Sequence, residues 1–400
     1  MNPLKSAQLL KQVMFDYYKS MSSPVAWCTS AGPAELLRSF GFSVYFPENH
    51  GALLGATRRA NDCIPLAVNA GYSGEICSYL TSDIGAYLKR ETPLTRAYGL
   101  KEVPKPDLIV FNTNQCREVE DWFTFFAGEF DSPIHGIHPP RHLDRIREPE
   151  IELVVRQLGD LISTCERVSG TQFDEDRFGE VVSLSKEGTR LWQEVLQTAR
   201  THPSPLTFFD GTIHMGPIVL LRGTQECVDY YQVLLSELKE RMEKGVGAVE
   251  KEQCRIFWDG MPVWGRLRAL ADLFHDNRAA VIASTYCNSW IFDSFDEKDP
   301  MESLALAYTQ IFINRSEQAK LSMLKQWISD FDIDGVIFHN AKTCFNNSNT
   351  RFGLPKRLEE ETGIPGLIVE GDLNDLRFFS DAQNRTKIET FVEQITGQEY

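Results

Sequence analysis

Three cysteines, each just past a segment with the pattern of a strand or a turn, are the residues of this chain best suited to chemistry. They are Cys77 in EICSYLTSDIG, Cys116 in LIVFNTNQCRE and Cys344 in VIFHNAKTCFNNS. Open α/β sheets bind ligands beyond the carboxyl ends of their strands. Three thiolates gathered there can hold an iron–sulfur cluster and leave one iron without a protein thiolate. These residue types therefore suggest a metal centre that can meet a substrate.

The alternative interpretation is that these thiols are inert, because free cysteine is among the most buried residue types. The gaps of 39 and 228 residues between the three match no zinc-finger or ferredoxin spacing. We expect the inert role for Cys165 and Cys227 inside predicted helices, and for Cys254 at the start of a predicted strand. Cys77 differs because it lies at a predicted helix start, which stabilises a thiolate.

Alternating strands and helices must position the three cysteines. Apolar runs predict strands at 25–30, 43–47, 106–113, 132–139, 254–260, 279–285, 334–340 and 365–372. Such alternation calls for parallel sheets with helices on both faces. We therefore predict an α/β fold of two doubly wound parallel-sheet lobes joined by a helical region. The predicted parts are an N-terminal lobe (1–145) with Cys77 and Cys116, a helical linking region (146–250) and a C-terminal lobe (251–400) with Cys344.

Composition argues against several classes of partner. The 400 residues carry a formal charge of -15, which disfavours nucleic acid and anionic membranes. No apolar run has the length of a membrane span, and the first residues lack the apolar segment of a signal peptide. The nine cysteines then fit reduced thiols or metal ligands better than disulfides. We expect a cytoplasmic protein with no nucleic-acid or membrane partner.

Longer segments around the three cysteines resemble a known family. They include AGYSGEICSYLTSDIGAYL, NTNQCREVEDWF and HNAKTCFNNSNTRFGLPKRLEEETGIPGLIVEGDL. Over roughly residues 25–395 the chain resembles the 2-hydroxyacyl-CoA dehydratase and benzoyl-CoA reductase family, and it looks most like a cluster-bearing subunit of ATP-dependent aryl-CoA reductases of the benzoyl-CoA type. The resemblance implies that Cys77, Cys116 and Cys344 bind a [4Fe–4S] cluster. The chain departs from the family in having Asn346, Asn347, Ser348 and Asn349 where relatives often have a Ser-Gly-Gln-like run.

The resemblance also implies a reaction and partners. It implies transfer of low-potential electrons to an acyl-CoA thioester through radical intermediates, with a homologous second subunit. ATP hydrolysis would belong to an iron–sulfur activator, since this chain has no GxxxxGK[ST] phosphate loop.

A thioester carbonyl that takes up an electron needs a hydrogen-bond donor beside it. Our candidates are Ser30, Ser78, Thr113 and His339, of which we favour Ser30 and His339. His339 could also give a proton, although a capping or core role is the alternative for it. Asp372, at the end of a predicted strand, suits a cleft-facing acid or a helix cap. Arg58, Arg59 and Lys342 could bind the phosphates of CoA, and the alternative is that they are ordinary solvent-exposed cations.

Three other functions stay open from the sequence. The first is a subunit of a 2-hydroxyacyl-CoA dehydratase, the second is an electron-relay or scaffold subunit without substrate contact, and the third is an α/β protein with unrelated buried thiols. The three cysteines decide between the last of these and the others, because a cluster requires their sulfurs to converge.

Overall fold

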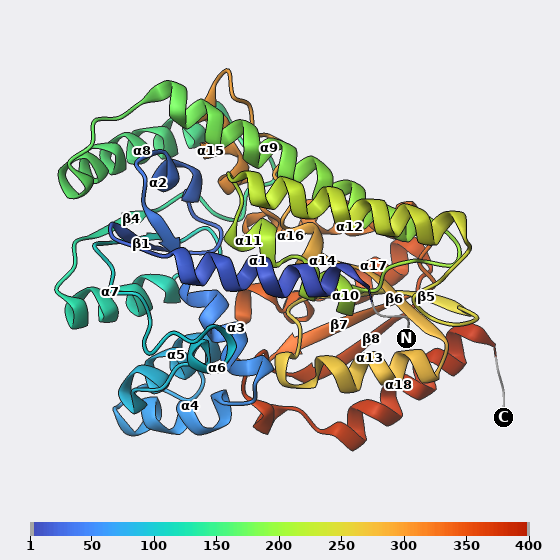
Figure 1. Cartoon of the computed structure of the whole chain (residues 1–400). Coiled ribbons are helices and arrows are strands. Elements are labelled where there is room, and N and C mark those ends of the chain that lie inside the picture. Colours follow the sequence, from blue (N-terminus) through green and yellow to red (C-terminus); the bar gives the residue numbers. More distant parts are fainter. Residues whose placement is uncertain (1–3, 398–400) are drawn as a thin grey trace.

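Two parallel four-stranded sheets organise the chain, of which the computed structural model describes residues 4–397 (Figure 1). The first sheet has the order β2-β1-β3-β4, with β1 (Val25–Cys28), β2 (Ser43–Tyr45), β3 (Leu108–Asn112) and β4 (Ile134–Ile137). The second has the order β6-β5-β7-β8, with β5 (Cys254–Asp259), β6 (Ala279–Ser284), β7 (Gly335–Ala341) and β8 (Gly366–Gly371). All neighbouring strands are parallel. The predicted α/β fold with two doubly wound lobes is confirmed.

The shared strand order fixes where each lobe can bind a ligand. In the first sheet the chain passes from β1 outward to β2 and then crosses back to β3 on the other side of β1. The second sheet repeats this with β5, β6 and β7. The crevice beyond the carboxyl ends of the two central strands is the topological switch point, where open α/β sheets bind ligands. Cys116 follows β3 and Cys344 follows β7, so each lies at the switch point of its own sheet.

Helices cover both sheets and connect them. Those of the first lobe are α1 (Ser6–Ser20), α2 (Ala34–Ser39), α3 (Pro47–Ala56), α4 (Ala60–Asn69), α5 (Ser78–Lys89), α6 (Leu94–Tyr98) and α7 (Glu118–Phe130). The connecting helices are α8 (Glu148–Ser169), α9 (Glu175–Gln197), α10 (Phe208–His214), α11 (Gly216–Leu220) and α12 (Gln225–Glu243). Those of the second lobe are α13 (Leu267–Asp276), α14 (Thr285–Asn288), α15 (Pro300–Thr309), α16 (Glu317–Phe331), α17 (Leu354–Thr362) and α18 (Asp381–Thr396). Within residues 4–397 no helix has the length and apolar character to cross a bilayer.

The long connecting helices hold the lobes together. Helices α9 and α12 pack on each other and run along one side of the molecule, and α1 crosses its face between the lobes (Figure 1). Helix α8 packs against α15, so a helix of the second lobe contacts the linking region. Sequence explains the helix ends: the Asp174 carboxylate caps α9 by accepting from Arg177 N–H, and Gly170 ends α8 with a φ of 71°. The division at 145 and 250 stays a prediction.

One apolar core reaches from the first lobe through the helical region into the second. The central strands of the second sheet serve two cores because successive side chains point to opposite faces. Trp258 and Ile337 join the large core, whereas Phe257 and Val336 join a smaller core behind the sheet. The lobes are therefore fixed relative to each other by packing, and the loops at their facing switch points are held in a defined arrangement.

Candidate functional site

The three predicted cysteines lie in one group between the lobes. All three are half-buried, whereas the other six cysteines are buried. Burial raises the pKa of Cys77, and the neighbouring Cys116 and Cys344 raise it further. Burial and Cys116 likewise raise the pKa of Cys344, to about 12. The thiols are therefore near enough to influence one another electrostatically, and their sharing of one metal centre stays a prediction.

Each of the three sulfurs lies at the start of a helical segment. Cys77 precedes α5, Cys116 lies two residues before α7, and Cys344 precedes a 3-10 turn at Phe345–Asn347. The backbone N–H groups three residues further on, of Leu80, Val119 and Asn347, lower the thiol pKa of Cys77, Cys116 and Cys344 in turn. Helix starts also favour negative charge. Burial outweighs these effects, so the pKa of each thiol is raised overall.

Three thiols are the type of donor that iron–sulfur clusters use. Among the described residues, no three or more His, Cys, Asp or Glu side chains are grouped so that they could hold a metal ion. Cys77, Cys116 and Cys344 remain predicted ligands.

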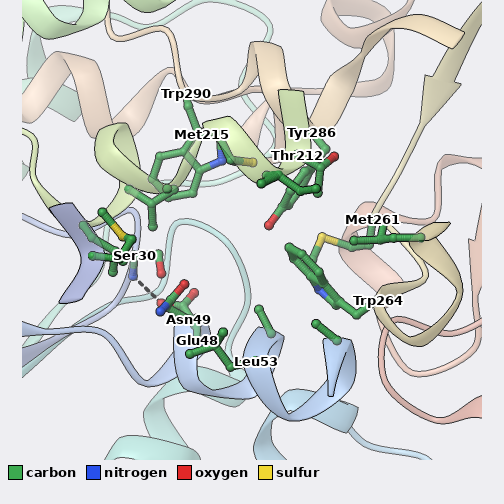
Figure 2. Close-up of a pocket in the computed structure, with 18 of the residues that line it drawn as sticks. Ser30, Glu48, Asn49, Leu53, Thr212, Met215, Met261, Trp264, Tyr286 and Trp290 are labelled. Carbon is green, nitrogen blue, oxygen red and sulfur yellow. Dashed lines mark hydrogen bonds between the residues drawn. The ribbon is translucent and has the colours of Figure 1, made fainter. Parts of the chain in front are cut away.

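A cavity of about 930 Å³ lies against the three cysteine segments (Figure 2). Tyr79 lines it two residues after Cys77, Gln115 lines it directly before Cys116, and Asn347 lines it three residues after Cys344. The loops after β1 and β5 add Ser30 and Met261. Both switch points therefore open into one space, which neighbours of the three cysteines line although the cysteines themselves do not.

The cavity is apolar within and cationic where it meets solvent. Figure 2 shows Met261, Trp264 and Tyr286 across the space from Ser30 and Glu48. The wall is completed by aromatic and methionine side chains that include Trp290, Phe292 and Met215. The lining cations Lys11, Arg58 and Arg268 are exposed. Of the cations proposed from sequence, Arg58 lines the cavity, whereas Arg59 and Lys342 do not.

The half-buried carboxyl group of Glu48 lines the cavity near Cys116. Ser30 N–H donates to Glu48 Oε2, and Gln115 Nε2 donates to Glu48 Oε1 at 3.0 Å. Burial raises the pKa of Glu48 and outweighs these bonds, which lower it. A carboxyl group of this kind holds a proton at higher pH than an exposed one. Sequence reasoning found Ser30 and missed Glu48, whose place after Pro47 at the start of α3 is typical of an ordinary first-turn acid.

His339 lies away from this cavity. It is buried in β7, and its ring is not part of the cavity lining. Nδ1–H donates to the Met261 carbonyl oxygen at 2.6 Å, and burial lowers the pKa of the imidazole. The neutral ring leaves Nε2 as a buried acceptor without a hydrogen-bond partner among the described residues. Its proposed role as a proton donor stays a prediction, and this environment favours a structural role.

A buried ion pair supports the loop that carries Ser30. Arg222 and Glu35 are fully buried, with 3.2 Å between Arg222 Nε and Glu35 Oε1. Arg222 also donates to Tyr308 OH at 2.7 Å and to the Gly32 carbonyl oxygen at 2.7 Å. Gly32 lies two residues after Ser30, so this guanidinium fixes the turn after β1 from the helical side of the molecule.

We expect Arg222→Met to destabilise the fold by about 3–5 kcal/mol, because it leaves the Glu35 charge buried without its cation. Urea unfolding followed by circular dichroism measures this loss. Arg190→Met is the matched control: Arg190 pairs with Glu187 on the surface, where such pairs contribute about 0–1 kcal/mol. Equal unfolding midpoints for the two variants would contradict the assigned role of Arg222.

The sequence of the chain matches a protein family and several characterised relatives. A family model described as 2-hydroxyglutaryl-CoA dehydratase, D-component, matches residues 29–395. The (R)-phenyllactyl-CoA dehydratase alpha subunit of Clostridium sporogenes is 28% identical over 389 residues, 95% of this chain and 91% of that one. The lactoyl-CoA dehydratase alpha subunit of Anaerotignum propionicum is 29% identical, over 94% of this chain and 92% of its own. A benzoyl-CoA reductase subunit of Thauera aromatica is 28% identical, over 90% of this chain and 86% of its own.

Proposed function

Because the chain belongs to the 2-hydroxyglutaryl-CoA dehydratase D-component family, we propose that it is the iron–sulfur subunit of an enzyme that delivers low-potential electrons to an acyl-CoA thioester. The reaction we propose first is aryl-CoA reduction of the benzoyl-CoA type. The convergence of Cys77, Cys116 and Cys344 beside one cavity is the observation that carries the proposal. Identity alone favours neither reaction, since the reductase subunit and the dehydratase subunits match almost equally well.

We assign the three cysteines as ligands of a [4Fe–4S] cluster. When bound, the cluster supplies single electrons at low potential. The chain's part is to hold three thiolates and to keep the group half-buried. Because three thiolates leave one iron without a protein ligand, the adjoining cavity gives substrate access to the site.

The cavity accounts for the two ends of an acyl-CoA. Lys11, Arg58 and Arg268 lie where the cavity meets solvent and can bind the phosphates of CoA. The aromatic wall offers an aryl group apolar contact and stacking. Burial raises the pKa of Glu48, which makes it our candidate to give a proton to the reduced substrate.

A second candidate is dehydration of a 2-hydroxyacyl-CoA. The pair formed by Ser30 and Glu48 supports it, since a carboxyl group of raised pKa can protonate a departing substrate hydroxyl. The electron-relay alternative is less well supported, because the cavity touches the segments of all three cysteines.

The relatives are all named as subunits of enzymes, which indicates that such chains work with others. We propose a homologous second subunit and an ATP-hydrolysing iron–sulfur activator as partners. The activator is required because the sequence of this chain contains no phosphate loop.

Product analysis of the anaerobically purified complex tests the proposal. The complex is incubated with ATP, a chemical reductant and either benzoyl-CoA or a 2-hydroxyacyl-CoA. Ring reduction to a dienoyl-CoA consumes two electrons and two protons, whereas loss of water to an enoyl-CoA consumes no net electrons. A dienoyl-CoA with matching reductant consumption supports the first reaction, and an enoyl-CoA without it supports the second. A colourless chain free of iron and sulfide under strict oxygen exclusion would refute both.

We expect Arg268→Glu to raise KM for the acyl-CoA about tenfold and to leave kcat unchanged. Arg268 is an exposed cation at the cavity, and one charge-assisted hydrogen bond to phosphate is worth about 1.5–3 kcal/mol. The rise should shrink with added salt because exposed charges are screened. Lys387→Glu, on α18 and outside this cavity, is the control. Identical KM values for both variants would mean that Arg268 does not contact the CoA moiety.

A further inference from the structure

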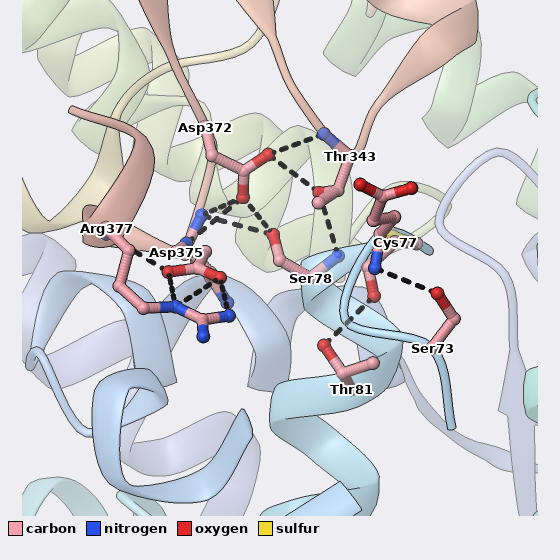
Figure 3. Close-up of polar contacts among 10 residues, drawn as sticks. Ser73, Cys77, Ser78, Thr81, Thr343, Asp372, Asp375 and Arg377 are labelled. Atoms are coloured by element: carbon pink, nitrogen blue, oxygen red, sulfur yellow. Dashed lines mark hydrogen bonds and ion pairs between the residues drawn. The ribbon is translucent and has the colours of Figure 1, made fainter. Parts of the chain in front are cut away.

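Asp372, directly after β8, is a fully buried carboxylate that accepts five hydrogen bonds (Figure 3). Oδ1 accepts from Thr343 N–H at 2.8 Å and from the Thr343 hydroxyl at 2.7 Å. Oδ2 accepts from the Ser78 hydroxyl, from Asn374 N–H at 3.2 Å and from Asp375 N–H at 3.0 Å. The carboxylate therefore caps its own turn and also binds two distant segments, which excludes the cleft-facing role considered from sequence.

The two distant segments are those that carry cysteines. Ser78 directly follows Cys77, and Thr343 directly precedes Cys344. Ser78 N–H also donates to Thr343 Oγ1 at 3.0 Å, which closes a ring of hydrogen bonds through Asp372. One anion thus connects a cysteine segment of the first lobe to a cysteine segment of the second.

The turn that follows Asp372 is anchored to the first lobe as well. Asn374 Nδ2 donates to the Gly51 carbonyl oxygen at 2.8 Å and to Ser82 Oγ at 3.0 Å. Gly55 is packed so tightly against Asn374 that a Cβ there would lie 1.9 Å from its Oδ1. Helices α3 and α5 therefore hold the turn in place, and Asp372 cannot move without them.

We propose that Asp372 is a positioning residue that fixes the Cys77 and Cys344 segments at the spacing required for shared ligation. The inference rests on the proposed function, because it concerns the same thiols. The distance between two ligands on separate lobes varies whenever the lobes move relative to each other. A buried carboxylate that is hydrogen-bonded to both ligand segments restricts this relative motion.

The geometry requires a carboxylate rather than an amide. Each oxygen of Asp372 accepts from at least one backbone N–H, which cannot rotate away. Asparagine would turn its NH2 group toward one of these donors in either orientation, and would leave that side unbonded. Asp372→Asn therefore keeps the size of the side chain and breaks the connection.

The test compares Asp372→Asn with Asp375→Asn in the anaerobically reconstituted protein. Asp375 is also buried, but among the described residues its carboxylate accepts only from Arg377 and reaches neither cysteine segment. The readout is the rate at which an iron chelator removes iron. We expect a rate about 10- to 100-fold above wild type for Asp372→Asn and a wild-type rate for Asp375→Asn, as for other groups that orient metal ligands.

A second pair of variants controls for the possibility that Asp372→Asn loses iron because it misfolds. Thr343→Val removes the hydroxyl that donates to Asp372 and accepts from Ser78, and Thr343→Ser restores it. We expect faster iron loss in the valine variant and recovery in the serine variant, with unchanged urea midpoints of the iron-free proteins. Equal chelator rates for Asp372→Asn, Thr343→Val and wild type would overturn the positioning role. An iron-free wild type would instead reject the proposed function itself.

Discussion

Cys116→Ala is expected to remove the cluster from the purified chain and to lower turnover of the complex by more than about 100-fold. Loss of a group that only orients a metal ligand already costs about 10–100-fold, and loss of a ligand should cost more. Cys116 is the predicted ligand of the first switch point, and its sulfur raises the pKa of both Cys77 and Cys344. Iron, acid-labile sulfide and the visible spectrum, each measured anaerobically, report the effect.

Cys165→Ala is the matched control for this experiment. Cys165 lies fully buried in α8, outside the group of three, so its loss should leave iron content unchanged. Folding of both variants is compared by circular dichroism. Full iron content in folded Cys116→Ala would show that the sulfur of Cys116 is no ligand.

Glu48→Gln should lower kcat by about 10²–10⁴, the usual contribution of a positioned proton donor. Burial raises the pKa of Glu48, so the carboxyl group stays protonated to higher pH than an exposed glutamic acid. A proton donor acts only in its protonated form. The wild-type rate should therefore hold at low pH and fall as pH rises through the raised pKa of Glu48. This fall should be absent in Glu48→Gln, and the pH profile of kcat measures it.

Ser30→Ala is the informative companion to this variant. It keeps the backbone N–H that donates to Glu48 and removes the Ser30 hydroxyl, which also lowers the pKa of Glu48. The fall in rate should therefore persist and move to higher pH. If Glu48→Gln retained the wild-type pH profile, Glu48 would not be the proton donor.

The strands could be predicted from sequence because buried parallel strands are continuous apolar runs. Seven of the eight predicted segments contain the whole of an observed strand in residues 4–397, each shortened at the carboxyl end, and β7 extends one residue beyond the segment predicted at 334–340. The run at 25–30, for example, ends as a strand at Cys28 because Thr29 and Ser30 belong to the turn at the switch point. The three cysteines could be singled out in the same way, because strand ends and helix starts can be recognised in short stretches of sequence. The resemblance to a known family then grouped them as ligands of one site.

The charged groups of the site could not be predicted in this way. Glu48 stands out in no local pattern, and its role depends on Gln115, 67 residues away. Arg222 reaches Gly32 across 190 residues of sequence. The sequence allowed Asp372 to be either a cleft-facing acid or a helix cap. Its hydrogen bond from the Ser78 hydroxyl shows that the carboxylate instead connects distant segments. Burial of a charge is a property of the assembled lobes, and no short segment encodes it.

The contact between Ser78 and Asp372 joins residues 294 positions apart, and this separation bears on how the protein matures in a cell. A growing chain presents Cys77 and Cys116 long before Cys344 has been translated. Contacts of such high order form late. With the three cysteines as shared ligands, as proposed, metal loading would wait for the finished polypeptide, and the two early thiols would have to be kept from oxidation in the meantime.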